Sequence, residues 1–234
     1  MTTPIIALDV PTLDAALSVA DQLAGLCGFY KVGLELFTAE GPRVVRALRD
    51  RGADVFLDLK LHDIPNTVRG GVARAAGHGA RLVTVHAAGG RAMLEAAQAG
   101  AEGTGCGVLA VTVLTSLDGA ALAAAWGRDA GTLDVQAEVM RLAGDAATAG
   151  VHGVVCSGHE AAGVRDRFGA GLATLVPGVR LAGSGADDQA RVVTPAAAVR
   201  AGARYVVIGR TVTAAGEPRG AMERVVAELG SAGA

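Results

Sequence analysis

Short apolar runs alternate with longer, alanine-rich stretches along the whole chain. Runs of four to six residues rich in Val, Ile and Leu predict buried strands, and the stretches between them have the length of helices. The predicted strands are residues 5–8, 29–32, 55–59, 82–86, 108–113, 153–156, 173–176 and 205–208. The predicted helices lie near residues 12–25, 39–51, 66–78, 91–101, 133–149, 159–168, 195–201 and 217–230.

The pattern contains eight strand–helix units in 234 residues. A helix after every strand indicates a parallel sheet, and eight such units are typical of a closed (β/α)8 TIM barrel. A doubly wound open sheet is the alternative. No linker or low-complexity segment divides the chain, so residues 1–234 are interpreted as a single domain.

Two of the predicted connections are long. Residues 114–132 are expected to hold a short extra helix near residues 120–126. Residues 177–192 are rich in Gly, Ser and Asp, and long polar loops that follow strands often act as lids.

Composition and charge narrow the classes of function. The formal net charge is −2, so nothing indicates a nucleic-acid-binding surface. No apolar run approaches the roughly 20 residues of a membrane span, and the N-terminus MTTPIIALD is too short and polar for a signal peptide. Cys27, Cys106 and Cys156 lack metal-ligand spacing, which favours reduced thiols. We therefore expect a cytoplasmic protein without nucleic-acid or membrane partners.

The segment DLKLHDIPNT, residues 58–67, follows a predicted buried strand and contains three charged residues, Asp58, Lys60 and Asp63. Residues i and i+2 of a strand point to the same face, so Asp58 and Lys60 are expected to share a side. Unpaired charges there would be costly, so they must pair with each other or with a ligand. Because α/β enzymes place their chemistry at the C-terminal ends of parallel strands, the segment predicts a catalytic site.

Other predicted strands also end at or near residues that could form a site, most of them polar or charged. These are Asp9, Lys31, His86, Thr115, Pro177, Arg180, Gly209 and Arg210. In a barrel they would converge on one mouth. Gly178 and Gly209 allow close backbone approach, and Arg180 and Arg210 offer charge-assisted donors, so the last two strands predict a phosphate site.

With these segments assembled, the chain resembles the orotidine 5′-monophosphate decarboxylase family. The matching motifs are ALDV (7–10), YKVGLELF (30–37), DLKLHDIPNT (58–67), VTVLTS (111–116), VPGVR (176–180), DDQ (187–189) and VVIGR (206–210). Related phosphosugar enzymes, such as 3-keto-gulonate 6-phosphate decarboxylase, share the Asp-x-Lys-x-x-Asp pattern. In those relatives a metal-binding acidic residue usually follows the second strand, where this chain has Lys31.

The resemblance implies decarboxylation of orotidine 5′-monophosphate to uridine 5′-monophosphate and carbon dioxide, the last step of de novo UMP synthesis. It implies a carboxy-lyase without cofactor or metal. It also implies a homodimer in which Asp63 and Ile64 are contributed across the interface. Two rival functions stay open, namely a metal-dependent phosphosugar decarboxylase or aldolase, and a non-catalytic nucleotide-binding barrel.

Residue roles follow from the same resemblance. A fixed cation beside the developing carbanion is the obvious catalytic device, and Lys60 is the candidate that also donates the proton. It would belong to an alternating network Lys31–Asp58–Lys60–Asp63, in which the carboxylates favour the ammonium form. The expected substrate-binding residues are Asp9, Lys31, Ile64, Thr67, Thr115, Pro177, Arg180, Gln189, Gly209 and Arg210. Among these, Asp9 has an alternative role as a cap of the helix that begins near Thr12, while His62 and His86 are expected to be structural.

Overall fold

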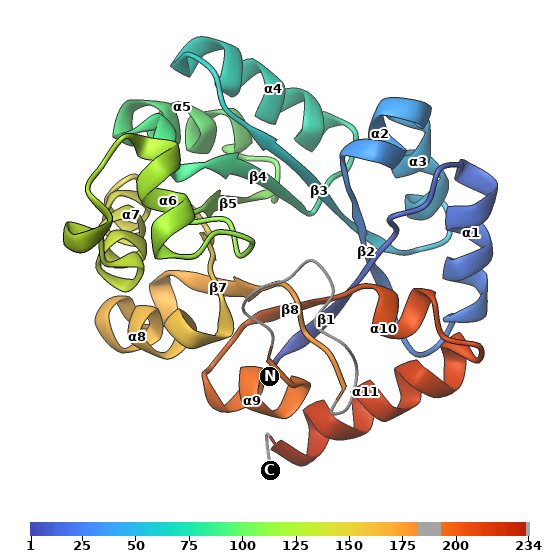
Figure 1. The fold of residues 1–234 in the computed structure, drawn as a ribbon. Helices are drawn as coiled ribbons and strands as arrows, with labels where there is room; N and C mark the ends of the chain where they lie inside the picture. Colours follow the sequence, from blue (N-terminus) through green and yellow to red (C-terminus); the bar gives the residue numbers. More distant parts are fainter. Residues whose placement is uncertain (182–192, 233–234) are drawn as a thin grey trace.

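A closed barrel of parallel strands in sequence order forms the centre of the computed structural model, which describes residues 1–181 and 193–232 (Figure 1). The strands are β1 (Thr3–Ala7), β2 (Phe29–Val32), β3 (Asp54–Leu61), β4 (Leu82–His86), β5 (Gly107–Val111), β6 (Gly153–Val155), β7 (Ala173–Val176) and β8 (Tyr205–Ile208). Strand β1 pairs with both β2 and β8, which closes the barrel. The predicted (β/α)8 barrel is confirmed, and the open-sheet alternative is wrong.

Helices surround the barrel (Figure 1). They are α1 (Leu13–Gln22), α2 (Leu34–Glu40), α3 (Arg43–Arg49), α4 (Pro65–Gly77), α5 (Arg91–Ala101), α6 (Gly119–Trp126), α7 (Val135–Thr148), α8 (Gly158–Phe168), α9 (Pro195–Arg200), α10 (Arg210–Thr213) and α11 (Pro218–Ala232). Local sequence explains several helix starts, because Thr12, Asp134 and Ser157 each accept a backbone N–H bond at the beginning of α1, α7 and α8.

Two helix predictions need correction. The single helix predicted over residues 39–51 is wrong, since α2 ends at Glu40 and the next residue, Gly41, has a φ of 58°. Pro42 follows and cannot donate a backbone hydrogen bond, so α3 begins as a separate helix. The short helix α10 was not expected, whereas the extra helix near residues 120–126 is confirmed as α6.

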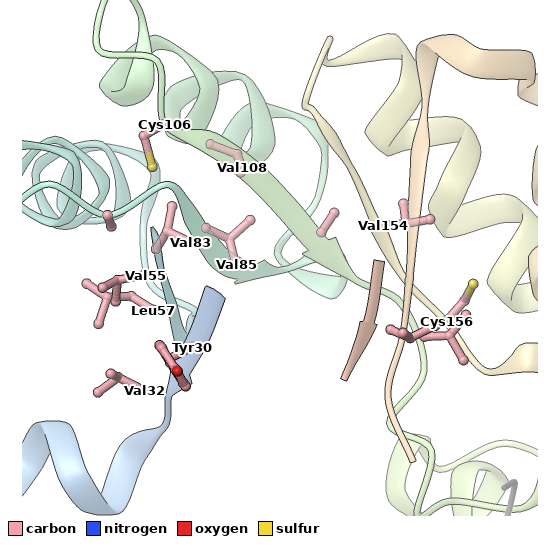
Figure 2. Packing of buried hydrophobic residues seen from close by; sticks show 14 of the residues in the cluster. Tyr30, Val32, Val55, Leu57, Val83, Val85, Cys106, Val108, Val154 and Cys156 are labelled. Atoms are coloured by element: carbon pink, nitrogen blue, oxygen red, sulfur yellow. The ribbon is translucent and has the colours of Figure 1, made fainter. Parts of the chain in front are cut away.

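Strand alternation divides the core into two layers. Inside the barrel lie Ile5, Ala7, Phe29, Phe56, Leu82, Leu109, Leu175, Tyr205 and Val207. Their strand neighbours, such as Val55 and Leu57, belong to the larger layer between barrel and helices, part of which is drawn in Figure 2. Full burial of a large aliphatic side chain contributes about 1.5–3 kcal/mol, so this double core provides a rigid support for the strand ends.

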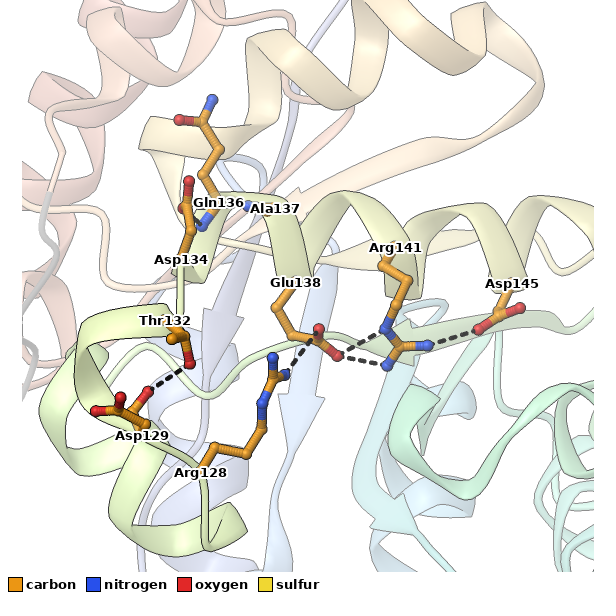
Figure 3. A network of polar contacts seen from close by, with 9 residues as sticks. All are labelled: Arg128, Asp129, Thr132, Asp134, Gln136, Ala137, Glu138, Arg141 and Asp145. Carbon is orange, nitrogen blue, oxygen red and sulfur yellow. Dashed lines mark hydrogen bonds and ion pairs between the residues drawn. The ribbon is translucent and has the colours of Figure 1, made fainter.

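The connection from β5 to α7 is fastened by ion pairs (Figure 3). Glu138 of α7 is buried and accepts from Nε of Arg141 at 2.9 Å. Arg128, which follows α6, places Nη1 at 3.8 Å from the other carboxylate oxygen of Glu138. These contacts tie the end of α6 to α7, and the start of the same connection, at Leu114, lines the cavity described below.

Candidate active site

A cavity of about 580 Å³ opens at the C-terminal ends of the strands. Side chains from inside the barrel form its apolar floor, among them Phe56, Leu175 and Val207. Nine residues predicted from the sequence line it, namely Asp9, Lys31, Asp58, Lys60, Thr115, Pro177, Arg180, Gly209 and Arg210. An apolar floor with a few convergent polar groups is the usual composition of a small-molecule site.

Four charged residues in the cavity form an alternating chain, Asp9–Lys31–Asp58–Lys60. Nζ of Lys31 lies 2.8 Å from Oδ1 of Asp9 and 3.8 Å from Oδ2 of Asp58. Nζ of Lys60 lies 2.8 Å from Oδ1 of Asp58. Lys31 therefore lies between two carboxylates and Asp58 between two ammonium groups, which holds both ammonium groups in position.

The backbone at Lys60 is unusual. Its φ of 50° makes it the one non-glycine residue with positive φ in the described part of the chain. The β3–β4 pairing also shifts between Leu57 and Leu61, so residues 58–60 bulge out of the ladder. Bulges and left-handed residues often re-aim side chains near active sites. The predicted shared face of Asp58 and Lys60 is confirmed, but a bulge rather than a regular strand produces it.

Thr84 of β4 is a site residue that the sequence reasoning missed. It is fully buried, and its Oγ1 contacts both the Lys60 backbone and the Asp58 carboxylate. The alternation of side chains along a strand could have identified it, since Thr84 lies two residues after Leu82 and so shares the inward face of β4.

The opposite wall of the cavity comes from the ends of β7 and β8. Pro177, Gly178 and Arg180 follow β7, and Gly178 has a φ of 69°, which glycine adopts without strain. Arg180 donates its backbone N–H to the carbonyl of Val193 at 3.0 Å. Gly209 and Arg210 follow β8, where α10 begins. This wall brings Arg180, Arg210 and two glycines to the cavity at the place where the sequence predicts a phosphate site, whereas Gln189 lies outside the described residues.

Three predicted residues lie away from the cavity of their own chain. Within the described residues, the cavity lining does not include Asp63, Ile64 or Thr67. All three are exposed between β3 and the first turn of α4, and 67% of Ile64 is accessible. Oδ1 of Asp63 accepts the backbone N–H of Ile64 at 2.6 Å. One chain therefore supplies Asp9 rather than Asp63 to its own charge network.

Local contacts describe Asp9, His62 and His86, three further residues that the sequence analysis considered. Asp9 does not cap α1, because Thr12 occupies that position and Asp9 contacts Lys31. His62 and His86 pack together with ring centroids 5.3 Å apart. Burial, with further contributions from His62 and Lys60, lowers the pKa of His86.

The residues present do not form an evident metal site. Among residues 1–181 and 193–232, no three His, Cys, Asp or Glu side chains gather as a metal would require. The ammonium of Lys31 itself sits between the carboxylates of Asp9 and Asp58. A separate finding is that no helix in the described ranges is long and apolar enough to cross a membrane.

Fold and cavity together define a class of protein, a (β/α)8 barrel with an internally paired Lys–Asp site facing an arginine-bearing wall. The chain belongs to the orotidine 5'-phosphate decarboxylase / HUMPS family, whose model matches residues 2–225. The family resemblance inferred from the motifs is thereby confirmed. The chain is a decarboxylase of the family that catalyses the last step of UMP biosynthesis.

Curated relatives support this assignment. The chain is 56% identical over 225 residues to the orotidine 5'-phosphate decarboxylase of Anaeromyxobacter sp. (strain K), covering 95% of this chain and 96% of the relative. It is 50% identical over 233 residues to that of Halorhodospira halophila (strain DSM 244 / SL1), covering 98% and 96%.

Solved structures agree in fold. Orotidine 5'-phosphate decarboxylase from Lactobacillus acidophilus matches with a TM-score of 0.86 and 33% identity, covering 98% of this chain and 99% of that one. An uncharacterized conserved protein from Geobacillus kaustophilus matches with a TM-score of 0.82 and 38% identity, covering 97% and 99%.

Proposed function

We propose that this chain decarboxylates orotidine 5′-monophosphate to uridine 5′-monophosphate without a cofactor or metal. The observation that carries the proposal is the Asp58–Lys60 ion pair, 2.8 Å long, above an apolar floor and opposite an arginine-bearing wall. The names of the relatives from Anaeromyxobacter and Lactobacillus acidophilus support the choice of substrate.

Lys60 carries the central step. When the bond between the ring carbon and the carboxylate breaks, carbon dioxide leaves and the electron pair stays on the ring carbon. The ammonium of Lys60 stabilises this charge and then transfers one proton to the same carbon, forming the new C–H bond. Preorganised charge of this kind acts strongly over an apolar floor, and enzymes lower barriers by about 8–23 kcal/mol.

Asp58 has two roles in this proposal. Its carboxylate holds the ammonium at 2.8 Å, and Lys31 contacts its other oxygen at 3.8 Å. This contact keeps the Lys60 ammonium in place as the proton donor. In the substrate complex Asp58 also lies close to the scissile carboxylate, and their repulsion raises the energy of the ground state.

Binding is divided among the other cavity residues. Asp9 and Lys31 bind the ribose hydroxyl groups, and Thr115 contacts the pyrimidine. Arg180 and Arg210 bind the phosphate together with the backbone near Pro177 and Gly209. Gln189, which lies outside the described residues, bridges phosphate and base as its loop closes. Interactions with the remote phosphate thereby contribute to organising the reacting centre.

Asp63, Ile64 and Thr67 fit the proposal if the protein is a homodimer. They are exposed on their own chain and do not reach its cavity in the described structure. Asp63 and Ile64 would complete the cavity of the second subunit, where Asp63 flanks Lys60. The exposed Ile64 side chain would then be covered by the partner subunit.

Three broader expectations belong to the same proposal. Metal independence is supported by Lys31, whose ammonium lies between Asp9 and Asp58 where a cation would have to bind. A cytoplasmic location is supported by Cys27 and Cys106, which are free thiols. A single folding domain over residues 1–234 is supported by the closed barrel that joins β1 to β8.

The test is the loss of absorbance as orotidine 5′-monophosphate becomes uridine 5′-monophosphate, with excess EDTA, for wild type and Lys60→Ala. Wild-type turnover should survive the chelator, and the variant should lose at least ~10³-fold in kcat because it lacks the cation beside the carbanion. Binding of uridine 5′-monophosphate by calorimetry checks that the variant is folded. Absent or EDTA-sensitive wild-type turnover would contradict the proposal and favour a binding barrel or a metal-dependent phosphosugar enzyme.

A further inference from the structure

Thr84 contacts Asp58 and Lys60 from the buried interior of the barrel. It lies on β4 with 0% of its surface accessible, and it does not line the cavity of the described chain. Leu82, two residues earlier, packs inside the barrel, so strand alternation points Thr84 to the same interior. The hydroxyl of Thr84 therefore faces the neighbouring strand β3 without reaching the substrate.

The irregular pairing of β3 explains why a side chain is needed there. Leu57 pairs with Val83 and Leu61 pairs with Val85, so four steps along β3 correspond to two steps along β4. Residues 58–60 consequently leave the regular ladder, and their backbone groups need other partners. The Lys60 N–H finds one in Oγ1 of Thr84, at 2.8 Å.

The same hydroxyl makes a second bond. Thr84 Oγ1 donates to Oδ1 of Asp58 at 3.0 Å, and that oxygen also accepts from Nζ of Lys60 at 2.8 Å. A hydroxyl has one proton and two lone pairs, so it can accept from the Lys60 backbone and donate to Asp58 together. The result is a closed ring of hydrogen bonds from the Lys60 backbone through Thr84 and Asp58 to the Lys60 ammonium.

We propose that Thr84 is a positioning residue that holds Asp58 and Lys60 in their reactive geometry through this ring. The strained backbone of Lys60, with its φ of 50°, is retained because the Thr84 hydroxyl replaces the missing ladder bond. The inference rests on the proposed decarboxylase function for its kinetic consequence, while the geometry is a property of the free enzyme.

Two substitutions separate the hydroxyl from the shape of the side chain. Thr84→Val keeps the branched shape and removes both hydrogen bonds, whereas Thr84→Ser keeps the hydroxyl. Thr174→Val is the matched control, since Thr174 is also a buried strand threonine and its Oγ1 has no partner within the described residues.

We expect Thr84→Val to lower kcat by roughly 10²-fold, because small misplacements of reacting groups have effects of that size. The KM for orotidine 5′-monophosphate should change less than about threefold, since Thr84 does not line the cavity of the described chain. Thr84→Ser should recover kcat to within about fivefold of wild type, and Thr174→Val should leave both constants unchanged.

Two results would overturn the inference. One is a Thr84→Val enzyme with kcat within about twofold of wild type. The other is a Thr84→Ser enzyme as impaired as Thr84→Val, which would show that the methyl group and not the hydroxyl matters. If wild type itself shows no turnover, the proposed function fails separately. Crystal structures of wild type and Thr84→Val then decide, because the inference requires the Lys60 φ or the Asp58 carboxylate to move.

Discussion

Lys31 is the most confined charged residue of the site, and a glycine provides the space for it. Gly33 lies so close that a Cβ atom there would be 3.0 Å from Nζ of Lys31 and 3.3 Å from Oδ1 of Asp9. Its φ of −92° suits any residue, so the absent side chain, not backbone freedom, is what the site requires. The position of the Lys31 ammonium thus depends on the absence of a side chain at Gly33.

Gly33→Ala should therefore lower kcat/KM by roughly tenfold, because Nζ of Lys31 must shift by a few tenths of an ångström. The denaturation midpoint should hardly change, since the end of a lysine side chain can move at little cost. Gly28→Ala is the control, as a Cβ there meets nothing within 4 Å. Equal kinetics for Gly33→Ala and wild type would contradict the expected crowding.

His86 should make stability depend on pH. Burial lowers its pKa below the ordinary 6.5, His62 and Lys60 lower it further, and Asp58 acts in the opposite direction. The unfolded chain then binds more protons at His86, so the free energy of unfolding should fall as pH drops below about 6.5. The loss should level off only below the lowered pKa of the folded protein.

Urea denaturation at several pH values between about 7.5 and 5 tests this expectation. His86→Gln should show a flatter decline than wild type, and His159→Gln, at an exposed site on α8, should decline in parallel with wild type. Parallel curves for His86→Gln and wild type would exclude His86 as the source of the dependence.

At the scale of elements, α4 and α5 pack side by side against the outer face of the barrel (Figure 1). A Cβ atom at Gly100 of α5 would lie 2.5 Å from the backbone oxygen of Arg69 in α4. Because α4 begins directly after Asp63 and Ile64, its distance from α5 also determines where those two residues project.

Gly100→Ala should destabilise the protein by about 1–3 kcal/mol, because the helix backbones must separate. Activity should fall as well, since α4 moves the Asp63 segment with it. Gly77→Ala, also in a helix but with nothing within 4 Å, should be neutral or stabilising by up to ~1 kcal/mol. Chemical denaturation of both variants makes the comparison, and equal stabilities would contradict the close packing.

At the scale of the whole molecule, the exposed Asp63 predicts that one chain alone has an incomplete site. Lys60→Ala and Asp63→Ala should each be inactive as homodimers. Co-expression should restore about a quarter of wild-type activity, because random pairing makes half of the dimers mixed and each mixed dimer has one intact site. No recovery above the two separate variants would show that Asp63 acts within its own chain or does not act.

Much of this protein followed from the sequence alone. Apolar runs separated by helix-length stretches indicated a parallel sheet, and the count of eight strand–helix units favoured the closed barrel that the structure shows. The positions of Asp9, Lys31, Asp58, Lys60 and Arg210 at strand ends determined which groups meet at the mouth, since all parallel strands end on one side. Gly41 followed by Pro42 also indicates a helix break in the sequence, which the single helix predicted over residues 39–51 did not take into account.

Only the tertiary structure decided how these groups are aimed. Strand periodicity assigns Asp58 and Lys60 to one face, but the bulge, the positive φ of Lys60 and the role of Thr84 depend on the register between β3 and β4. That register arises from packing between segments distant in sequence, and the local pattern of apolar and polar residues does not predict it. The same holds for Asp63, whose exposure became evident only when the barrel placed it outside its own cavity.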